Sequence, residues 1–308
     1  MTLLRTLLLP LLLAIPAASG QSETLHPQDA KAPDFYAHWG DGQAEISSYK
    51  IVQPRYGQER TAYGVMIFVT EEINRQTLIK VESDATPPQD RLYVLKLNNV
   101  LKFTTGIYDY SVMTSVFSQV EGSDGPFQLH KVNLSAQEWC GHVYDEIQVR
   151  DDRLVGHINS YFESEGQQAY QLDAPSSFAS EDHLLIQIRE LKEALLPEGG
   201  TMEMALLPSL WSTRQAHRPH QLYKTTLHKG APTTIAVGGR QHAAIPWTWE
   251  SPDGDKTVWV EQAYPRRILA WREAGGGSGQ LQATLRKPYW RLHGNQDQAL
   301  RDELGIPR

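Results

Sequence analysis

The chain has 308 residues, of which 40% are hydrophobic and 21% are charged, so it can bury a sizeable core and is neither a disordered nor a coiled-coil protein. Its 29 basic and 36 acidic residues give a net charge of −7. That balance argues against nucleic-acid partners and against broad binding to an anionic membrane surface, because both need clustered Lys and Arg. A single cysteine excludes a disulfide within the chain.

The N-terminus has the pattern of an export signal. Arg5 precedes an apolar run at 7–15, and small residues follow up to Gly20. A short positive region, an apolar segment of this length and small residues together define a secretory signal peptide. The run is too short and too interrupted by proline to be an integral membrane span. We therefore expect cleavage near Ser19–Gly20 and a periplasmic location.

This signal sets the expected division of the chain. Residues 1–20 form the signal peptide, and the polar stretch 21–34 is a flexible lead-in. Residues 35–308 then form a β-rich domain, which could consist of two halves, 35–175 and 176–308.

Apolar runs bounded by turn residues predict strands through the first half. The runs lie at 44–69, with a turn at Pro54 and Gly57, and then at 94–100, 101–117, 129–149 and 153–172. Within 63–69 both alternating sets of residues are apolar, which is typical of a strand covered on each face.

The apolar spacing changes near residue 180, where one helix is predicted. Its apolar face repeats at steps of four, three and four residues and consists of Leu184, Ile188, Leu191 and Leu195. Ser180 is a suitable N-cap, and Pro197 with the glycines after it ends the helix. A strand over 183–188 remains an alternative, because apolar residues also alternate there.

Strands resume after residue 200. They are predicted at 202–206, 223–227, 233–237, 244–249, 257–264, 268–272 and 281–292, with a glycine-rich hairpin loop at 275–279 and a charged helical tail. Layering such strands around one helix predicts a mainly β fold, with a large curved antiparallel sheet or open half-barrel and one main helix packed on it.

One cluster of reactive side chains lies at 138–146. If its segment is a strand, Glu138, Cys140 and His142 share a face and Trp139 points to the core. Such residues could form a thiol nucleophile with its base, or bind a transition metal. The alternative, which we favour, is a buried, unreactive cysteine beside a hydrogen-bonded histidine. A lone thiol is better protected from an oxidising compartment when it is buried.

Aromatic side chains recur on the predicted strands. Six of them could line a groove for an apolar or sugar-like ligand, namely Trp247, Trp249, Trp259, Trp271, Tyr108 and Tyr110. They could equally be core between sheet and helix. A basic stretch at 214–229 could meet an acidic surface or a lipid head group, or lie in solvent. Motifs for serine hydrolases, P-loops, dinucleotides, zinc proteases and calcium loops are absent, so no cofactor and no metal is expected.

Two sets of segments resemble known groups of proteins. Residues 182–191 (DHLLIQIREL), 263–271 (AYPRRILAW) and 279–285 (GQLQATL) resemble exported β-rich bacterial proteins distantly related to periplasmic lipoprotein carriers. Residues 39–45 (WGDGQAE), 55–57 (RYG) and 137–142 (QEWCGH) are similar to an uncharacterised exported family whose members are sometimes labelled septum-formation inhibitor. The nucleotide pyrophosphatases behind that label carry a Ser-Pro-Arg-Arg motif near the N-terminus, which this chain lacks.

Two functions follow from these observations. The first is an exported, non-catalytic periplasmic protein that binds an apolar or amphipathic small molecule, or a cell-envelope protein, on its curved sheet. The alternative is an envelope enzyme or metal-binding protein that uses Cys140, His142 and Glu138. An open apolar groove would favour binding, whereas an exposed Cys140 within hydrogen-bonding distance of His142 would favour chemistry.

Overall fold

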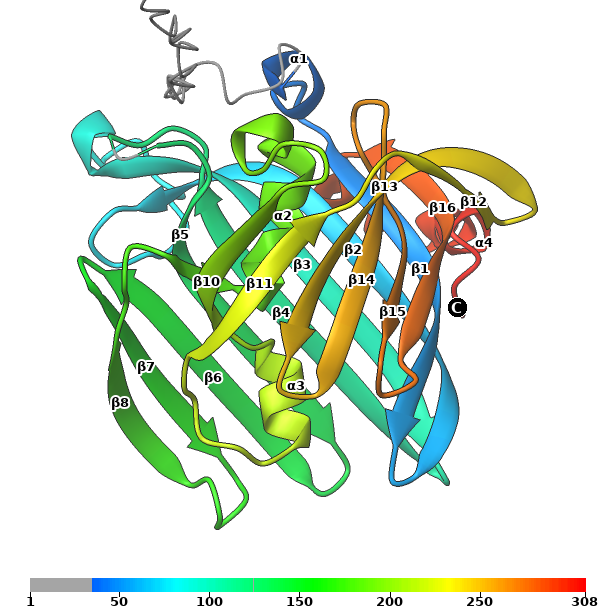
Figure 1. Ribbon diagram of the computed structural model, residues 1–308, viewed down its shortest axis with the longest axis horizontal. Coiled ribbons are helices and arrows are strands. Elements are labelled where there is room, and N and C mark those ends of the chain that lie inside the picture. Colours follow the sequence, from blue (N-terminus) through cyan, green and yellow to red (C-terminus); the bar gives the residue numbers. More distant parts are fainter. Residues whose placement is uncertain (1–34, 124) are drawn as a thin grey trace, which may run out of the picture.

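The computed structural model describes residues 35–123 and 125–308. The expected signal peptide and lead-in lie outside these ranges. The described chain is mainly β, with a single large, open, strongly curved sheet and few helices (Figure 1). The predicted fold class is therefore confirmed.

The first half of the sheet is a meander in which each strand pairs antiparallel with the next. Its strands are β1 (Ala44–Arg55), β2 (Gln58–Asn74), β3 (Arg91–Thr105), β4 (Tyr108–Gln119), β5 (Gln128–Glu138), β6 (Gly141–Arg150), β7 (Arg153–Ser160) and β8 (Gln167–Asp173). The predicted break between residues 100 and 101 was wrong. The turn lies at Gly106, whose φ of 59° supplies the left-handed conformation that a tight hairpin needs.

The strands of the second half of the chain continue the sheet beyond β1. Its strands are β9 (Phe178–Ser180), β10 (Thr201–Leu207), β11 (Tyr223–Lys229), β12 (Thr233–Val237), β13 (Arg240–Ser251), β14 (Gly254–Glu261), β15 (Ile268–Glu273) and β16 (Ser278–Lys287). Because β1 pairs with β16, the sheet runs from β8 to β1 and then from β16 back to β9, with β12 paired to β13 at the side. The two ends of the sheet, β8 and β9, are consecutive in the chain.

Short helices accompany the sheet. They are α1 (Phe35–Trp39), α2 (Glu181–Glu190), α3 (Leu210–Gln215) and α4 (Ala299–Glu303), with 3-10 turns at Pro88–Asp90, Lys192–Ala194, Tyr289–Arg291 and Asn295–Gln298. The main helix, α2, begins after Ser180 as predicted. It ends at Glu190, earlier than the apolar spacing indicated, because Lys192 adopts a φ of 49°. In the described part of the chain, none of the helices combines the length and apolar character needed to cross a membrane.

The helix α2 lies inside the curve of the sheet, between the β3–β6 region and the strands β10 and β11 (Figure 1). Nine of its ten residues are buried, and Gln187 is the half-buried exception. The sequence predicted that one apolar face of this helix is buried, but the structure buries nearly all of the helix. Polar side chains on the other faces are buried as well, so they need partners from the sheet.

Polar contacts span the opening between the two ends of the sheet. On β6, the Asp145 carboxylate accepts a hydrogen bond from Tyr170 Oη at 3.1 Å and lies 2.6 Å from His220 Nε2. The Tyr170 and His220 rings are stacked at 4.9 Å. Nearby, Arg214 pairs with Glu165 at 2.7 Å. Part of the predicted basic stretch thus meets acidic residues of the same chain.

Candidate functional site

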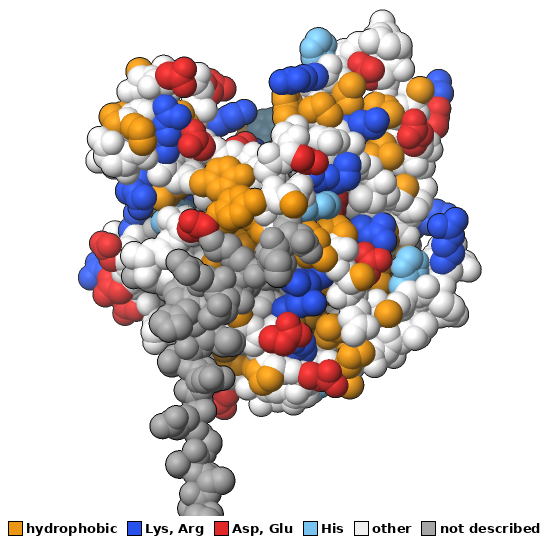
Figure 2. Space-filling view, turned by 90° about the horizontal axis from the view of Figure 1, so that it is seen from above, with side chains coloured by type: hydrophobic (Ala, Val, Ile, Leu, Met, Phe, Trp, Pro, Cys, Tyr) orange, Lys and Arg blue, Asp and Glu red, His pale blue; other side chains and the backbone are white. Residues whose placement is uncertain are grey.

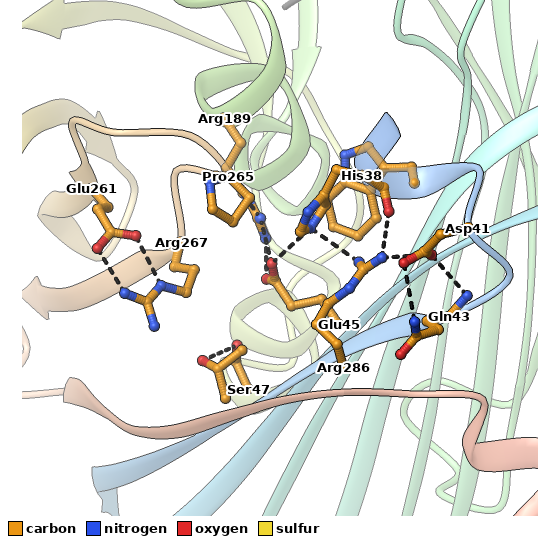
Figure 3. Close-up of polar contacts among 12 residues, drawn as sticks. His38, Asp41, Gln43, Glu45, Ser47, Arg189, Glu261, Pro265, Arg267 and Arg286 are labelled. Carbon is orange, nitrogen blue, oxygen red and sulfur yellow. Dashed lines mark hydrogen bonds and ion pairs between the residues drawn. The ribbon is translucent and has the colours of Figure 1, made fainter. Parts of the chain in front are cut away.

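A buried network of charges surrounds the C-terminal end of α2, beside α1 (Figure 3). Arg189 donates two hydrogen bonds to Glu45, at 2.8 and 3.1 Å, and a third to the Pro265 carbonyl at 2.9 Å. Burial by itself raises the pKa of Glu45, but the positive charge and hydrogen bonds of Arg189, with His38, hold that pKa at about 2. Glu45 is therefore a carboxylate at neutral pH.

The pKa of the neighbouring Glu190 is shifted in the opposite direction from that of Glu45. Its Oε1 accepts a 3.3 Å hydrogen bond from Trp39 Nε1, while its buried Oε2 has no partner. Burial raises the pKa of Glu190 to about 7 despite the nearby Arg189 and Arg266. Within the described chain, neither Glu45 nor Glu190 lines the cavity beside α2 and α3 or the outer groove that are described below. The network fixes α2 to α1 and β1.

On its outer side, this network links the last strand, β16, to the segment that contains α1 and Asp41. Arg286 of β16 donates to Asp41 Oδ1 at 2.7 Å and lies 3.0 Å from His38 Nε2. The face of the molecule at this end mixes basic, acidic and hydrophobic side chains (Figure 2). Among the described residues of this face, no single sign of charge dominates that would select a charged partner.

A cavity of about 330 Å³ lies between the sheet and the helices α2 and α3. Much of its wall is apolar and is contributed by strand and helix interiors: Ile51, Met66, Leu101, Val112, Leu185, Trp211, Val258, Ile268 and Trp271. A volume of this size, with an apolar wall and a few polar groups, is at the lower end of the range for small-molecule sites.

The polar part of the wall is a charged triad. Lys256 Nζ lies 3.1 Å from Glu181 Oε1 and 3.0 Å from Glu273 Oε1. Burial alone would lower the pKa of Lys256, but the two carboxylates raise it, so the ammonium stays charged. Beside the triad, burial raises the pKa of Asp182 to about 6, although the Leu210 amide and Ser209 hydroxyl both donate to it.

The cavity opens at the end of the molecule opposite α1. Part of its lining comes from hairpin turns, strand ends and the end of α3 at that side: Gln53, Pro54, Gln215, Ala216, Ser251, Asp253, Gly254, Gly275, Gly277 and Ser278. The triad lies on the first residues of α2 and next to two of these turns, in β14 and β15. The cavity is thus polar towards its mouth and mainly apolar along the strand interiors, where Asn99 and Thr114 are the polar lining residues.

The structure separates the six aromatic residues that were predicted to line a groove. Trp247 and Trp249 are 1% exposed and belong to the core, so they do not line a groove. Trp271 lines the cavity, with its ring 5.1 Å from that of Tyr49.

The other three aromatic residues do not line this cavity. Trp259 faces an outer groove with Arg272, whose guanidinium is 6.0 Å from its ring. Tyr110 stacks on Phe103 at 4.6 Å, and Tyr108 lies 5.8 Å from Tyr110. Tyr110 and Trp271 also line this outer groove, so three of the six aromatic residues share one groove, whereas Trp247 and Trp249 belong to the core.

The predicted cysteine cluster is corrected by the turn between β5 and β6. Trp139 and Cys140 form that turn, so both side chains are exposed rather than buried. Glu138 and Gly141 pair across the hairpin, which places His142 on the following strand. Within the described chain no hydrogen bond joins Cys140 to His142, and no group of three metal-binding side chains occurs.

No protein-family model matches this sequence, and a search of curated proteins finds no match.

The charged triad was missed by sequence analysis, because Glu181, Lys256 and Glu273 belong to three elements far apart in the chain. Only the tertiary structure brings them together. An acidic residue in the first turn of a helix, such as Glu181, has an ordinary structural explanation from the sequence alone.

Proposed function

We propose that this protein is exported to the periplasm and acts there as a non-catalytic binding protein for a small amphipathic molecule. The cavity between α2, α3 and the sheet is the binding site. The observation that carries the proposal is the polarity of this cavity, in which apolar side chains from strand interiors continue to the charged triad near the mouth. An apolar tail would lie along the strands and a polar head near Lys256.

Two further features support binding rather than catalysis. The triad pairs its charges internally, which suits recognition of a polar group more than proton transfer by a single poised acid or base. Of the residues of the alternative enzyme hypothesis, Cys140 lies in an exposed turn and His142 on the strand that follows, and neither lines the cavity. The export assignment rests on the sequence pattern of residues 1–20.

The test uses two neighbouring residues of β4. Val112 is buried and lines the cavity, whereas Met113 is 37% exposed and points to the other face. We expect Val112→Phe to fill part of the cavity and to reduce binding of the apolar fluorescent probe N-phenyl-1-naphthylamine. Met113→Phe should bind the probe like the wild type.

A thermal melt of both variants separates loss of the site from loss of the fold, since added bulk in a filled core typically costs about 1–3 kcal/mol. Native mass spectrometry of protein purified from its own periplasm should also show a bound small molecule. Equal probe binding by the wild type and a folded Val112→Phe variant would contradict the proposal.

A further inference from the structure

The meander from β1 to β8 places four hairpin turns along one end of the sheet. These are the β1–β2, β3–β4, β5–β6 and β7–β8 turns, because in an up-and-down meander every second connection falls at the same end (Figure 1). With strands about 4.8 Å apart, successive turns of this set are spaced roughly 10 Å along the edge. We call this edge the hairpin rim and define it by Tyr56, Ile107, Trp139 and Tyr161.

Each turn of the hairpin rim exposes one large hydrophobic side chain. The exposed fractions are 59% for Tyr56, 83% for Ile107, 68% for Trp139 and 76% for Tyr161. At the opposite end, the connections of the same meander in the described chain expose Ile79 as their large hydrophobic residue. The exposed apolar surface is therefore concentrated at one end.

Contacts link the three aromatic residues of the rim to neighbouring hairpins. The Trp139 ring lies 6.5 Å from Tyr108, which follows Ile107, and the Tyr161 ring packs over Gly141 of the next hairpin. Tyr56 Oη is 2.9 Å from Tyr110 Oη. Adjacent hairpins therefore hold the three aromatic side chains of the rim in place.

The second half of the sheet lacks such a row at the same end. Its turns there consist of small or polar residues at 251–254 and of the glycines that follow Ala274. These turns line the mouth of the cavity. The hairpin rim and the cavity mouth thus lie side by side on one end of the molecule, because β1 pairs with β16 between them.

The shape and chemistry of the rim fit a lipid bilayer better than a protein surface. A stable protein partner needs a contiguous patch with a packed centre, whereas this row is about one side chain wide and is flanked by charges. Narrow, protruding side chains can enter a fluid interface without a complementary rigid surface. Tyr and Trp are also the side chains enriched at membrane–water interfaces, where an apolar ring and a polar tip are both accommodated.

The charges beside the rim exclude an electrostatic mode of attachment. Arg55 is adjacent to Tyr56, but acidic residues accompany the other turns, namely Asp109, Glu138 and Glu163. A surface of mixed sign does not favour anionic head groups. Attachment would depend on burial of apolar rings, and it would be insensitive to salt.

We propose that the hairpin rim docks the protein peripherally on a lipid bilayer by inserting these four side chains into the interface of the membrane, with the cavity mouth facing the lipid. This surface goes beyond the proposed ligand binding and does not depend on what occupies the cavity. It would let an amphipathic molecule pass between bilayer and cavity without crossing bulk water.

The first test is flotation with vesicles of zwitterionic phosphatidylcholine. We expect the wild type to float with the vesicles at low and at high salt, and Ile107→Ser/Trp139→Ser to lose about tenfold or more in partitioning. The matched control Ile79→Ser/Trp290→Ser removes the same two residue types from exposed positions outside the rim and should float like the wild type. Val112→Phe should also float normally, which separates this proposal from the function of the cavity.

A second test uses the exposed Cys140 of the same turn as Trp139. It is the one cysteine of the chain, so an environment-sensitive dye can be attached there without further changes. The emission should shift to the blue when vesicles are added, and the same dye in Ile79→Cys/Cys140→Ser should not respond. Absence of wild-type flotation, its loss in high salt, or equal effects of the rim and control variants would overturn the proposal.

Discussion

Arg189 of α2 and Glu45 of β1 form a salt bridge through two hydrogen bonds, and both side chains are 1% exposed. The pair joins the enclosed helix to the strand at which the two halves of the sheet meet. In the interior, each charge has a large desolvation cost that the partner offsets, so the two residues act as a unit.

Removing one charge of this pair should destabilise the protein strongly. We expect Glu45→Gln to lower the free energy of unfolding by about 3–5 kcal/mol, because Arg189 would remain charged and buried without its partner. Urea unfolding gives the value. The matched control is Glu261→Gln, which breaks the pair with Arg267, 29% exposed, and should cost about 1 kcal/mol or less. Similar losses in the two variants would show that burial of the first pair is unimportant.

Glu190 should make the protein less stable as pH rises through neutrality. Its pKa is about 7 in the folded protein, against an ordinary value of 4.5, so between these pH values the folded state holds a proton that the unfolded state lacks. The slope of stability with pH is then negative. We expect Glu190→Gln to resemble the wild type below pH 4.5 and to be more stable than it above neutrality, by about 3 kcal/mol.

The measurement is the difference in unfolding free energy between wild type and variant across pH, which removes the contribution of all other groups. Glu193→Gln is a suitable control, because the Glu193 carboxylate lies close by in the chain but is 65% exposed beside Lys229. A difference between wild type and Glu190→Gln that does not change with pH would contradict the raised pKa of Glu190.

His183 should give a pH dependence of opposite sign. Burial lowers its pKa to about 3, from an ordinary value of 6.5, and its Nε2 lies 2.8 Å from Ser118 Oγ. Between these pH values the unfolded state binds a proton that the folded state does not, so stability is lost as pH falls. We expect His183→Gln to weaken this loss. The free energy of unfolding of the wild type should therefore increase relative to that of the variant as pH rises to 6.5. A parallel pair of curves would refute the assignment.

Cys140 should react rapidly with a thiol reagent in the native protein, because its side chain is exposed in the β5–β6 turn. Cys140→Ser should change the free energy of unfolding by less than about 0.5 kcal/mol, as is usual for surface sites. Labelling kinetics with and without denaturant provide the measurement. Protection of the native thiol by several orders of magnitude would instead support the burial expected from the sequence.

Local patterns were sufficient to predict the fold class and most strands, because each strand needs only its own apolar alternation and bounding turns. They failed where the turn lacks a strong signal. Trp139 and Cys140 are apolar residues in the middle of an alternating run, so the pattern predicts a strand that continues through them. The spacing of apolar residues located the helix but not its C-terminal end. The left-handed conformation of Lys192 has no distinctive signal in the sequence.

The site could not be predicted in the same way. Trp247 and Trp249 look like groove residues in sequence, yet their places in the core depend on how far the sheet curls over α2. The cavity draws its wall from both halves of the chain, and the pairing of β1 with β16 that brings those halves together leaves no trace in either strand alone. Long-range pairing of this kind is a property of the whole fold.

The strand order gives the fold an almost cyclic connectivity. Residues 174–177 link the two open ends of the sheet, and Ala44 pairs with Lys287 where the first and last strands meet. A circular permutant that begins at Ser176 and joins residue 308 to residue 35 through a flexible linker would therefore keep every strand pair. In that permutant, β16 and β1 become consecutive strands in the middle of the polypeptide. The new N- and C-termini lie at the opening between β8 and β9.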